Sequence, residues 1–287
     1  MVIFSENEAR HFCCSFDGSR GNTLESLLPY CKRALSNSKN LREGTSDFED
    51  FRSNLLRNSE RNLFLSASNY YSMHRLLVAG FASWAYVTSY YCAFYSAKAI
   101  LGMFGACVES DILVDVFSGG IGSQELRVKK DNAARNHLVT LAGGKRGSHQ
   151  TFWSAFYRAG ASLHAYVTDP TLRLALTPIT NDATWQIENR NDINYDTLKA
   201  IGLINDFDRS FITRGFLAGL PGILNTQNKV SEALIMLAFK YAKDFGLSTD
   251  ALHVLSGRRT LTRKLKRFIF KAGRGIAVAG NVTQLFI

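Results

Sequence analysis

The residues with the clearest potential for chemistry lie between positions 187 and 211, in the run IENRNDINYDTLKAIGLINDFDRSF. Arg190 and Asn191 are adjacent, and Tyr195 follows Arg190 after four intervening positions, directly behind Asn194. A guanidinium can bind a phosphate through two parallel hydrogen bonds, and the two amides could orient that phosphate. A phenol donates a hydrogen bond but is a poor base, since its ordinary pKa is about 10. These residue types are therefore compatible with a phosphate-binding group.

The same residues have a purely structural interpretation, in which they form the start of a helix. Asn189 or Asn191 would then cap the first turn by accepting backbone N–H groups. Arg190 would form an ion pair with Glu188 or Asp192. The sequence leaves both interpretations open.

A basic segment near the C-terminus is the second candidate. Residues 257–274, GRRTLTRKLKRFIFKAGR, carry eight Lys and Arg and no acid. Since the whole chain has a formal net charge of +10, the remaining residues carry only +10 − 8 = +2. The segment has the pattern of a cationic amphipathic helix, with a stripe formed by Leu261, Leu265, Phe268 and Ala272.

We expect this segment to contact the phosphates of a nucleic acid, because no acid follows Asp250 to neutralise it. The candidate nucleic-acid-binding residues are Arg258, Arg259, Arg263, Lys264, Lys266 and Arg267. Two alternatives remain: a solvated face docked on the rest of the protein by its apolar stripe, and, less favoured, an anionic membrane surface.

Several other kinds of site are excluded. The run GGKRGSH at residues 143–149 lacks the earlier glycine of a phosphate-binding loop. Residues 192–196 imitate the start of a calcium loop, but Thr197 and Leu203 occupy the positions that need glycine and glutamate. The six histidines are scattered and no zinc spacing occurs, so neither a metal nor a cofactor is predicted.

Composition favours a mostly α fold, since 46% of the 287 residues are hydrophobic and only four are Pro. The uncharged run Leu76–Ala97 is long enough to span a bilayer, but its Ser, Thr and Tyr content favours a buried helix of a bundle. Five cysteines without a CxxC pair, and charges within residues 1–20, indicate a cytoplasmic protein with unpaired thiols.

Periodicity predicts a series of helices and one glycine-rich interruption. The interruption, residues 106–148, is expected to be an insertion or loop-rich cap with a short strand at ILVDVF. Helices are expected over residues 23–36, near 51–57, over 63–105 with a break near Gly80, and over 150–167, 187–211, 230–245 and 258–271. Asp169-Pro170 is expected to end the fourth of these.

The segment WAYVTSYYCAFYSAKAIL (residues 84–101), taken together with residues 187–211, resembles the HEPN superfamily of helical ribonucleases, toxins and antiviral effectors. The resemblance implies a HEPN-like helical bundle over residues 63–215, with the insertion at about 106–148. Residues 1–62 would be a polar N-terminal segment, and residues 216–287 a helical extension that includes the basic helix.

The resemblance also implies a function. The family's catalytic pattern is Arg, a polar residue, and a His after four to six intervening positions. Proteins of the family cleave RNA without metal in a cleft between two copies. Here Arg190 and Asn191 match the first pair, and Tyr195 stands where the His would be at the shortest spacing. The implied protein is a homodimeric, RNA-targeting effector of bacterial defence with Arg190, Asn191, Asn194 and Tyr195 at its site, and the implied activity is that of an endoribonuclease.

The missing histidine supports an alternative, a non-catalytic HEPN subunit that binds or regulates a partner protein. HEPN proteins are often paired with a nucleotidyltransferase, which in some pairs modifies a tyrosine near the Arg motif; Tyr195 would be that residue. A third option is a helical scaffold with a basic tail. A distant histidine, such as His149 or His164, could also fold into the site.

Overall fold

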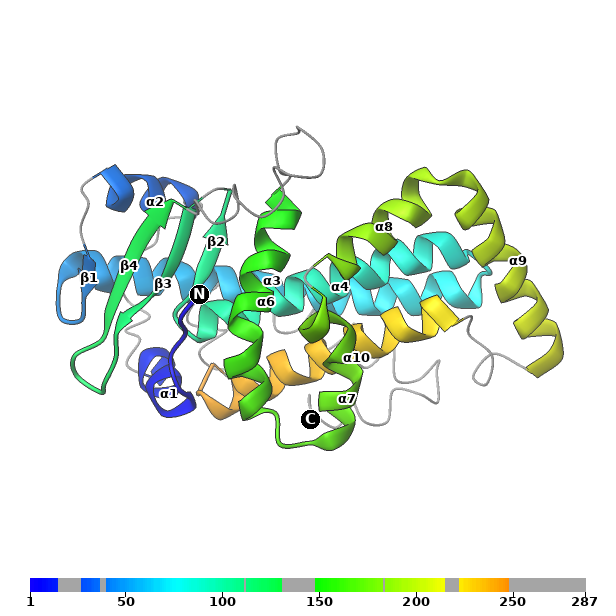
Figure 1. Ribbon diagram of the computed structural model, residues 1–287. Helices are drawn as coiled ribbons and strands as arrows, with labels where there is room; N and C mark the ends of the chain where they lie inside the picture. The colour runs from blue at the N-terminus through cyan, green and yellow to red at the C-terminus, as the bar shows by residue number, and fades with distance from the viewer. Residues whose placement is uncertain are drawn as a thin grey trace. The chain divides into compact units, whose positions relative to one another are not determined.

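The computed structural model of the chain describes residues 1–14, 27–36, 40–110, 112–130, 148–182, 184–214 and 222–247 (Figure 1). Most of these residues are helical, which confirms the mostly α class predicted from the sequence. The helix expected over residues 258–271, and with it all six basic candidate residues, lies outside the described residues.

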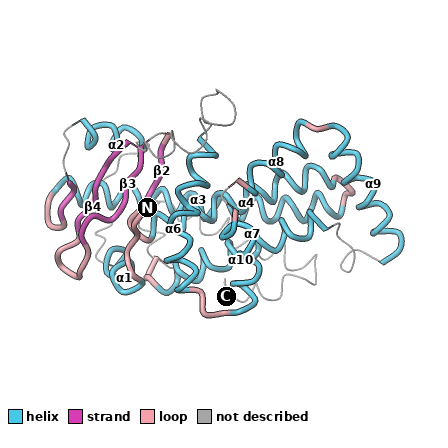
Figure 2. The backbone as a smooth tube through the Cα atoms, viewed as in Figure 1, coloured by secondary structure: helices cyan, strands magenta, loops and turns pink. Residues whose placement is uncertain are grey.

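The elements follow one another along the chain as Figures 1 and 2 show. The described helices are α1 (Glu6–Cys14), α2 (Leu27–Ser36), α3 (Ser46–Val78), α4 (Ala82–Met103), α6 (Ser148–Tyr166), α7 (Pro170–Asn181), α8 (Trp185–Tyr195), α9 (Thr197–Arg214) and α10 (Gly222–Asp244). The described strands are β1 (Asn40–Arg42), β2 (Cys107–Glu109), β3 (Ile112–Ser118) and β4 (Glu125–Lys130).

The described residues form two compact units. Unit 1 contains those of Met1–Arg61 and Lys98–Thr168, together with residues 241–247. Unit 2 contains those of Asn62–Ala97 and Asp169–Lys240. The boundaries fall within α3, α4 and α10, so these helices contribute residues to both units. The sequence predicted three consecutive parts, residues 1–62, 63–215 and 216–287. Each unit instead combines residues from more than one of these parts.

Unit 1 contains a four-stranded antiparallel sheet with the strand order β1-β4-β3-β2. Strand β1 comes from the N-terminal part of the chain and places Leu41 opposite Leu126 of β4. Helix α2 packs against β2, β3 and β4, and α6 contacts β2. The strands are magenta in Figure 2.

The sheet corrects one expectation from the sequence. The strand predicted at ILVDVF is confirmed as β3, but the loop-rich cap is wrong for residues 107–130, because β2 and β4 pair with β3 on either side. Buried Asp115 of β3 accepts a hydrogen bond of 2.6 Å from Lys129 of β4, which neutralises its charge. The β3–β4 turn needs glycine at Gly120 and Gly122, whose φ angles are 119° and 84°.

The break expected near Gly80 is confirmed as a full turn between two helices. Helix α3 ends at Val78, Gly80 has a φ of 81°, and α4 begins at Ala82. The turn therefore divides the uncharged run Leu76–Ala97 between α3 and α4. Among the described residues, none of the helices combines the length and hydropathy that a bilayer crossing requires.

Unit 2 is held together by polar contacts between helices as well as by apolar packing. The hydroxyls of Ser89 on α4 and Ser231 on α10 lie 2.7 Å apart, and Ser231 also hydrogen-bonds the backbone oxygen of Ser89. Both serines are fully buried. These bonds fix α10 against α4 at one position along both helices.

Helix α6 agrees with the helix predicted over residues 150–167, and the next helix begins where α6 was expected to end. The carboxylate of Asp169 accepts the backbone N–H groups of Thr171 and Leu172, at 2.7 and 3.3 Å. Pro170 occupies the first turn of α7, where its missing N–H costs nothing. The Asp-Pro pair therefore starts α7, a helix that the periodicity did not predict.

Candidate functional site

The segment predicted as one helix over residues 187–211 forms two helices, α8 and α9, which meet at Asp196. The Asp196 carboxylate accepts the backbone N–H groups of Leu198 and Lys199, at 3.0 and 3.2 Å, and so caps the start of α9. Arg190 consequently lies in the middle of α8, not at a helix start. The single continuous helix was wrong, because Asp196 caps a second helix within the periodic run.

The predicted capping role of the asparagines is also wrong. Helix α8 begins at Trp185, with Thr184 before it. Asn189 donates a hydrogen bond of 2.7 Å to the backbone oxygen of Trp185, one turn earlier in the helix. Asn191 lies further along α8, beside Arg190.

Arg190 is held by two tyrosines of α4, within unit 2. Its Nη2 donates to the hydroxyl of Tyr91 at 3.3 Å, and its Nη1 donates to Oδ1 of Asn191 at 3.0 Å. The guanidinium carbon lies 5.6 and 5.9 Å from the ring centroids of Tyr90 and Tyr91, within the range of cation–π attraction. These contacts, rather than an ion pair with Glu188 or Asp192, are the interactions found for Arg190.

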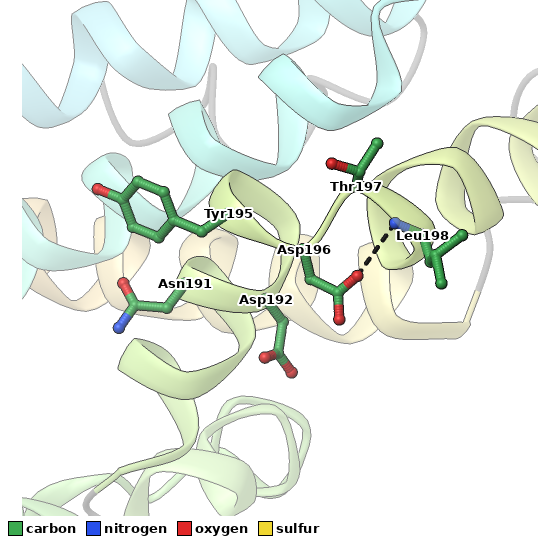
Figure 3. Close-up of a pocket in the computed structure, with 6 residues that line it drawn as sticks. All are labelled: Asn191, Asp192, Tyr195, Asp196, Thr197 and Leu198. Atoms are coloured by element: carbon green, nitrogen blue, oxygen red, sulfur yellow. Dashed lines mark hydrogen bonds between the residues drawn. The ribbon is translucent and has the colours of Figure 1, made fainter.

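An open pocket of about 520 Å³ lies at the junction of α8 and α9 (Figure 3). It is lined by Asn191, Asp192, Tyr195, Asp196, Thr197 and Leu198. Of the four residues predicted from the sequence, Asn191 and Tyr195 line this pocket; Arg190 is joined to it through Asn191, and Asn194 is exposed on α8. The Tyr195 side chain is 75% exposed, so its hydroxyl is accessible to a partner or a substrate.

Carboxylates dominate the charge of this pocket. Asp192 accepts a hydrogen bond of 2.6 Å from Nζ of Lys199, and this bond raises the pKa of Lys199. Asp196 contributes a second carboxylate, and Glu188 is exposed one turn before Asp192 on α8. A phosphate entering the pocket would meet these negative charges as well as the guanidinium of Arg190.

Helix α9 carries an exposed apolar row that the sequence analysis missed. Leu198, Ile201 and Ile204 are 81%, 48% and 38% exposed. Leu203 on the same helix is buried. The sequence did contain a signal for this row, because α9 has apolar residues on two faces. A helix that packs on one side needs only one apolar face.

The two histidines that the sequence left open as additions to the site, His149 and His164, lie on α6 in unit 1, whereas Arg190 belongs to unit 2. His74 is buried on α3, where its ring meets the edge of the Tyr70 ring at 4.5 Å, and burial lowers its pKa to about 4. Within the ranges that the structure describes, no group of His, Cys, Asp and Glu is arranged to hold a metal ion.

A half-buried carboxylate in unit 2 was also missed. Glu232 of α10 accepts a hydrogen bond from the hydroxyl of Tyr70 at 3.2 Å and lies within 3.5 Å of the amide nitrogen of Asn228. Partial burial raises the pKa of Glu232, while the bond from Tyr70 and the charge of Lys229 oppose that rise. A single acid in a helix of mixed composition gives no local sign that it will be partly buried.

Unit 1 has a smaller pocket of about 250 Å³ that contains no predicted residue. It is lined by Tyr30, Arg33, Ala34, Leu41, Asp47, Asp50 and Phe51. Arg33 stacks over the ring of Tyr30 at 4.3 Å. The mixture of acids, a base and aromatic rings gives this pocket no single chemical preference.

The chain is thus a mostly helical protein in which tyrosines of α4 hold an arginine of α8 next to an open pocket lined by acids. No protein-family model, curated protein or solved structure matches it.

Proposed function

We propose that this chain is an RNA-targeting effector of the HEPN type, with Arg190 and Asn191 as its phosphate-binding pair. The observation that carries the proposal is the hydrogen bond between Arg190 and Tyr91. It joins α8 to α4, and these helices contain the two sequence segments on which the HEPN resemblance depends. Two segments that a family places at its site lie in direct contact here.

The proposal includes a symmetric homodimer. In HEPN proteins the Arg motifs of two copies face one cleft, so Arg190, Asn191 and Tyr195 of each copy would converge on one RNA strand. The basic residues between 258 and 267 would bind the RNA backbone on either side. Two copies bring two guanidiniums to one RNA strand together with the carboxylates of both copies, and the basic residues supply the excess of positive charge.

The reaction we propose is cleavage of RNA by its own 2′-hydroxyl. A bond forms between the 2′-oxygen and phosphorus while the bond to the 5′-oxygen breaks, which leaves a 2′,3′-cyclic phosphate. The 2′-proton passes to the carboxylate of Asp192, and Tyr195 donates a proton to the departing 5′-oxygen. Water then returns the proton from Asp192 to Tyr195, and Arg190 stabilises the charge that builds on the phosphate.

Incubation of the purified chain with total tRNA and a structured RNA in EDTA tests this function. We expect cleavage by the wild type, its loss in Arg190→Ala, and a large reduction in Tyr195→Phe. Arg173→Ala, which removes an exposed arginine from α7, is the matched control and should cleave normally. Thermal denaturation and the oligomeric state of each variant establish that the fold is retained. Cleavage by Arg190→Ala at the wild-type rate would contradict the proposal.

The acidic lining of the pocket favours a second candidate, a non-catalytic HEPN subunit that acts with a partner protein such as a nucleotidyltransferase. Asp192 and Asp196 disfavour a phosphate, and no histidine follows Arg190 within the motif. The exposed hydroxyl of Tyr195 would then be a point of modification rather than a catalytic acid.

The two candidate functions predict different results when the purified chain is incubated with tRNA. A subunit of this kind leaves tRNA intact in the wild type and in all three variants. Incubation with a nucleotidyltransferase and its labelled nucleotide would add label to the wild type but not to Tyr195→Phe. Reversal of the charges at Arg263 and Lys264 would weaken association with the partner in a pull-down experiment.

A further inference from the structure

The outer face of α9 is apolar and exposed. Leu198, Ile201 and Ile204 follow one another at intervals of three residues along this face. Leu203 packs inward, so the helix is already anchored without them. Exposed leucine and isoleucine side chains in a continuous row are typical of a surface that is covered by another segment.

An acidic row borders this apolar row. Glu188 and Asp192 lie one turn apart on α8, and Asp196 follows at its junction with α9; these three residues form the acidic row. Asp192 is paired with Lys199 and Asp196 caps α9, so part of the negative charge of the row is offset. Asp206 adds an exposed acid near the far end of the apolar row. Figure 3 shows where the rows meet: Asp192 lies on α8, Asp196 at the junction of the two helices, and Leu198 at the start of α9, where its backbone N–H is bonded to the Asp196 carboxylate.

The chemistry of this surface selects among the possible occupants. RNA has no aliphatic face to cover the apolar row. A second copy in an isologous contact through the outer face of α9, which is not the contact proposed for the homodimer, would bring two acidic rows to one interface. A cationic amphipathic helix satisfies both rows at once, because its apolar stripe covers aliphatic side chains while its bases meet carboxylates.

The chain contains one segment of this composition. Residues 257–274 carry eight Lys and Arg without an acid, and their apolar positions recur at helical spacing. The segment lies outside the described residues and follows α10 in the chain. Because it belongs to the same chain, its binding at this surface is intramolecular, which raises its effective concentration there.

We propose that residues 257–274 dock on the surface formed by the apolar row of α9 and the acidic row of α8. The docked segment covers Leu198 and Ile201 of the apolar row. The docking does not depend on the proposed function.

Photo-cross-linking of the full-length chain tests the occupant directly. Leu198 is replaced by p-benzoylphenylalanine, which keeps an apolar side chain at that position. Leu174 of α7, which is 75% exposed and is not part of either row, is replaced in the same way as the control. A mixture of unlabelled and ¹⁵N-labelled protein distinguishes links within one chain from links between two.

We expect cross-links from position 198 to peptides of residues 257–274 of the same chain, and none from position 174 to those peptides. Cross-links from 198 only to a second copy, only to another segment, or to nothing would overturn the proposal. Equal cross-linking of the segment from both positions would overturn it as well, since contact would then be non-specific.

Trypsin gives an independent measurement, because the segment contains eight cleavage sites. Ile201→Asp places a charge in the apolar row and should increase the rate of cleavage within residues 257–274 about tenfold or more. Leu174→Asp should leave that rate unchanged. Equal rates in the wild type and both variants, with unchanged circular dichroism, would show that the segment is not docked there.

Discussion

At the scale of single residues, the contact between Arg190 and Tyr91 determines how the candidate site is held. The hydroxyl of Tyr91 accepts a hydrogen bond from a charged donor, and both tyrosine rings face the guanidinium. The rings remain in a phenylalanine variant while the acceptor is lost. Tyr91→Phe therefore separates the effect of the hydroxyl on Arg190 from the attraction between the rings and the guanidinium.

Tyr91→Phe should lower the free energy of unfolding by about 1 kcal/mol, the usual net contribution of one such hydrogen bond. Chemical denaturation of the wild type and the variant measures the change. Tyr195→Phe is the control, because its side chain is largely exposed and should change stability by less than about 0.5 kcal/mol. If Tyr91→Phe had no effect, Arg190 would not be anchored through that hydroxyl.

His74 predicts a pH dependence of stability. Burial lowers its pKa to about 4 in the folded chain, below the ordinary value of about 6.5 in the unfolded chain. Above pH 6.5 both states are neutral, so the fold keeps its full stability. As the pH falls from about 6.5 to 4, the unfolded state binds a proton that the folded state refuses, and about 3 kcal/mol is lost.

His74→Leu removes that proton-binding group and should flatten the loss of stability between pH 6.5 and 4. Denaturation curves at pH 7, 5.5 and 4 give the measurement, with the wild type as the reference. Because other acids titrate in the same range, the informative quantity is the difference between the two proteins at each pH. A constant difference across the range would contradict the assigned pKa.

At the scale of helices and strands, local signals in the sequence predicted some features and missed others for identifiable reasons. Gly80 was recognised because a glycine inside an apolar run interrupts a helix, and its positive φ requires one. Asp196 was missed because an aspartate is also tolerated within helices, and the periodicity continues from α8 into α9.

The sheet could not be predicted from local patterns. Strand β1 has three residues and pairs with β4, so Leu41 lies opposite Leu126 from a distant part of the chain. Such pairing depends on tertiary contacts that a window of neighbouring residues does not contain. The helical state of residues 84–101, by contrast, is predicted correctly, because a long apolar period is a local property.

The contact between α4 and α10 supports a prediction at this scale. Ser231→Ala removes the closest partner of the buried Ser89 hydroxyl, which keeps only a bond of 3.4 Å to the backbone oxygen of Gln227, and should destabilise the chain by about 1–3 kcal/mol. Ser89→Ala/Ser231→Ala removes both hydroxyls and should be less destabilising than the sum of the two single changes. Chemical denaturation of the four proteins gives this coupling. Additive effects would mean that the two hydroxyls do not stabilise each other.

At the scale of the whole molecule, two roles proposed for the basic segment exclude each other at any one moment. The same lysines and arginines bind either the acidic row of α8 or the phosphates of RNA. The docked state should therefore weaken RNA binding, and a change that weakens docking should strengthen it. The docking surface and the basic segment can be altered separately, which makes this competition measurable.

Ile201→Asp should bind a fluorescent single-stranded RNA several-fold more tightly than the wild type at low salt, in EDTA, although the substitution adds a negative charge. The reason is that it releases residues 257–274 from α9, while a direct electrostatic effect would weaken binding. Leu174→Asp carries the same added charge and should bind no better than the wild type. Reversing the charges at Arg263 and Lys264 in the Ile201→Asp background should remove the gain and reduce the dependence of affinity on salt. Equal or weaker binding by Ile201→Asp would mean that the segment is already accessible to RNA in the wild type, and that docking does not regulate it.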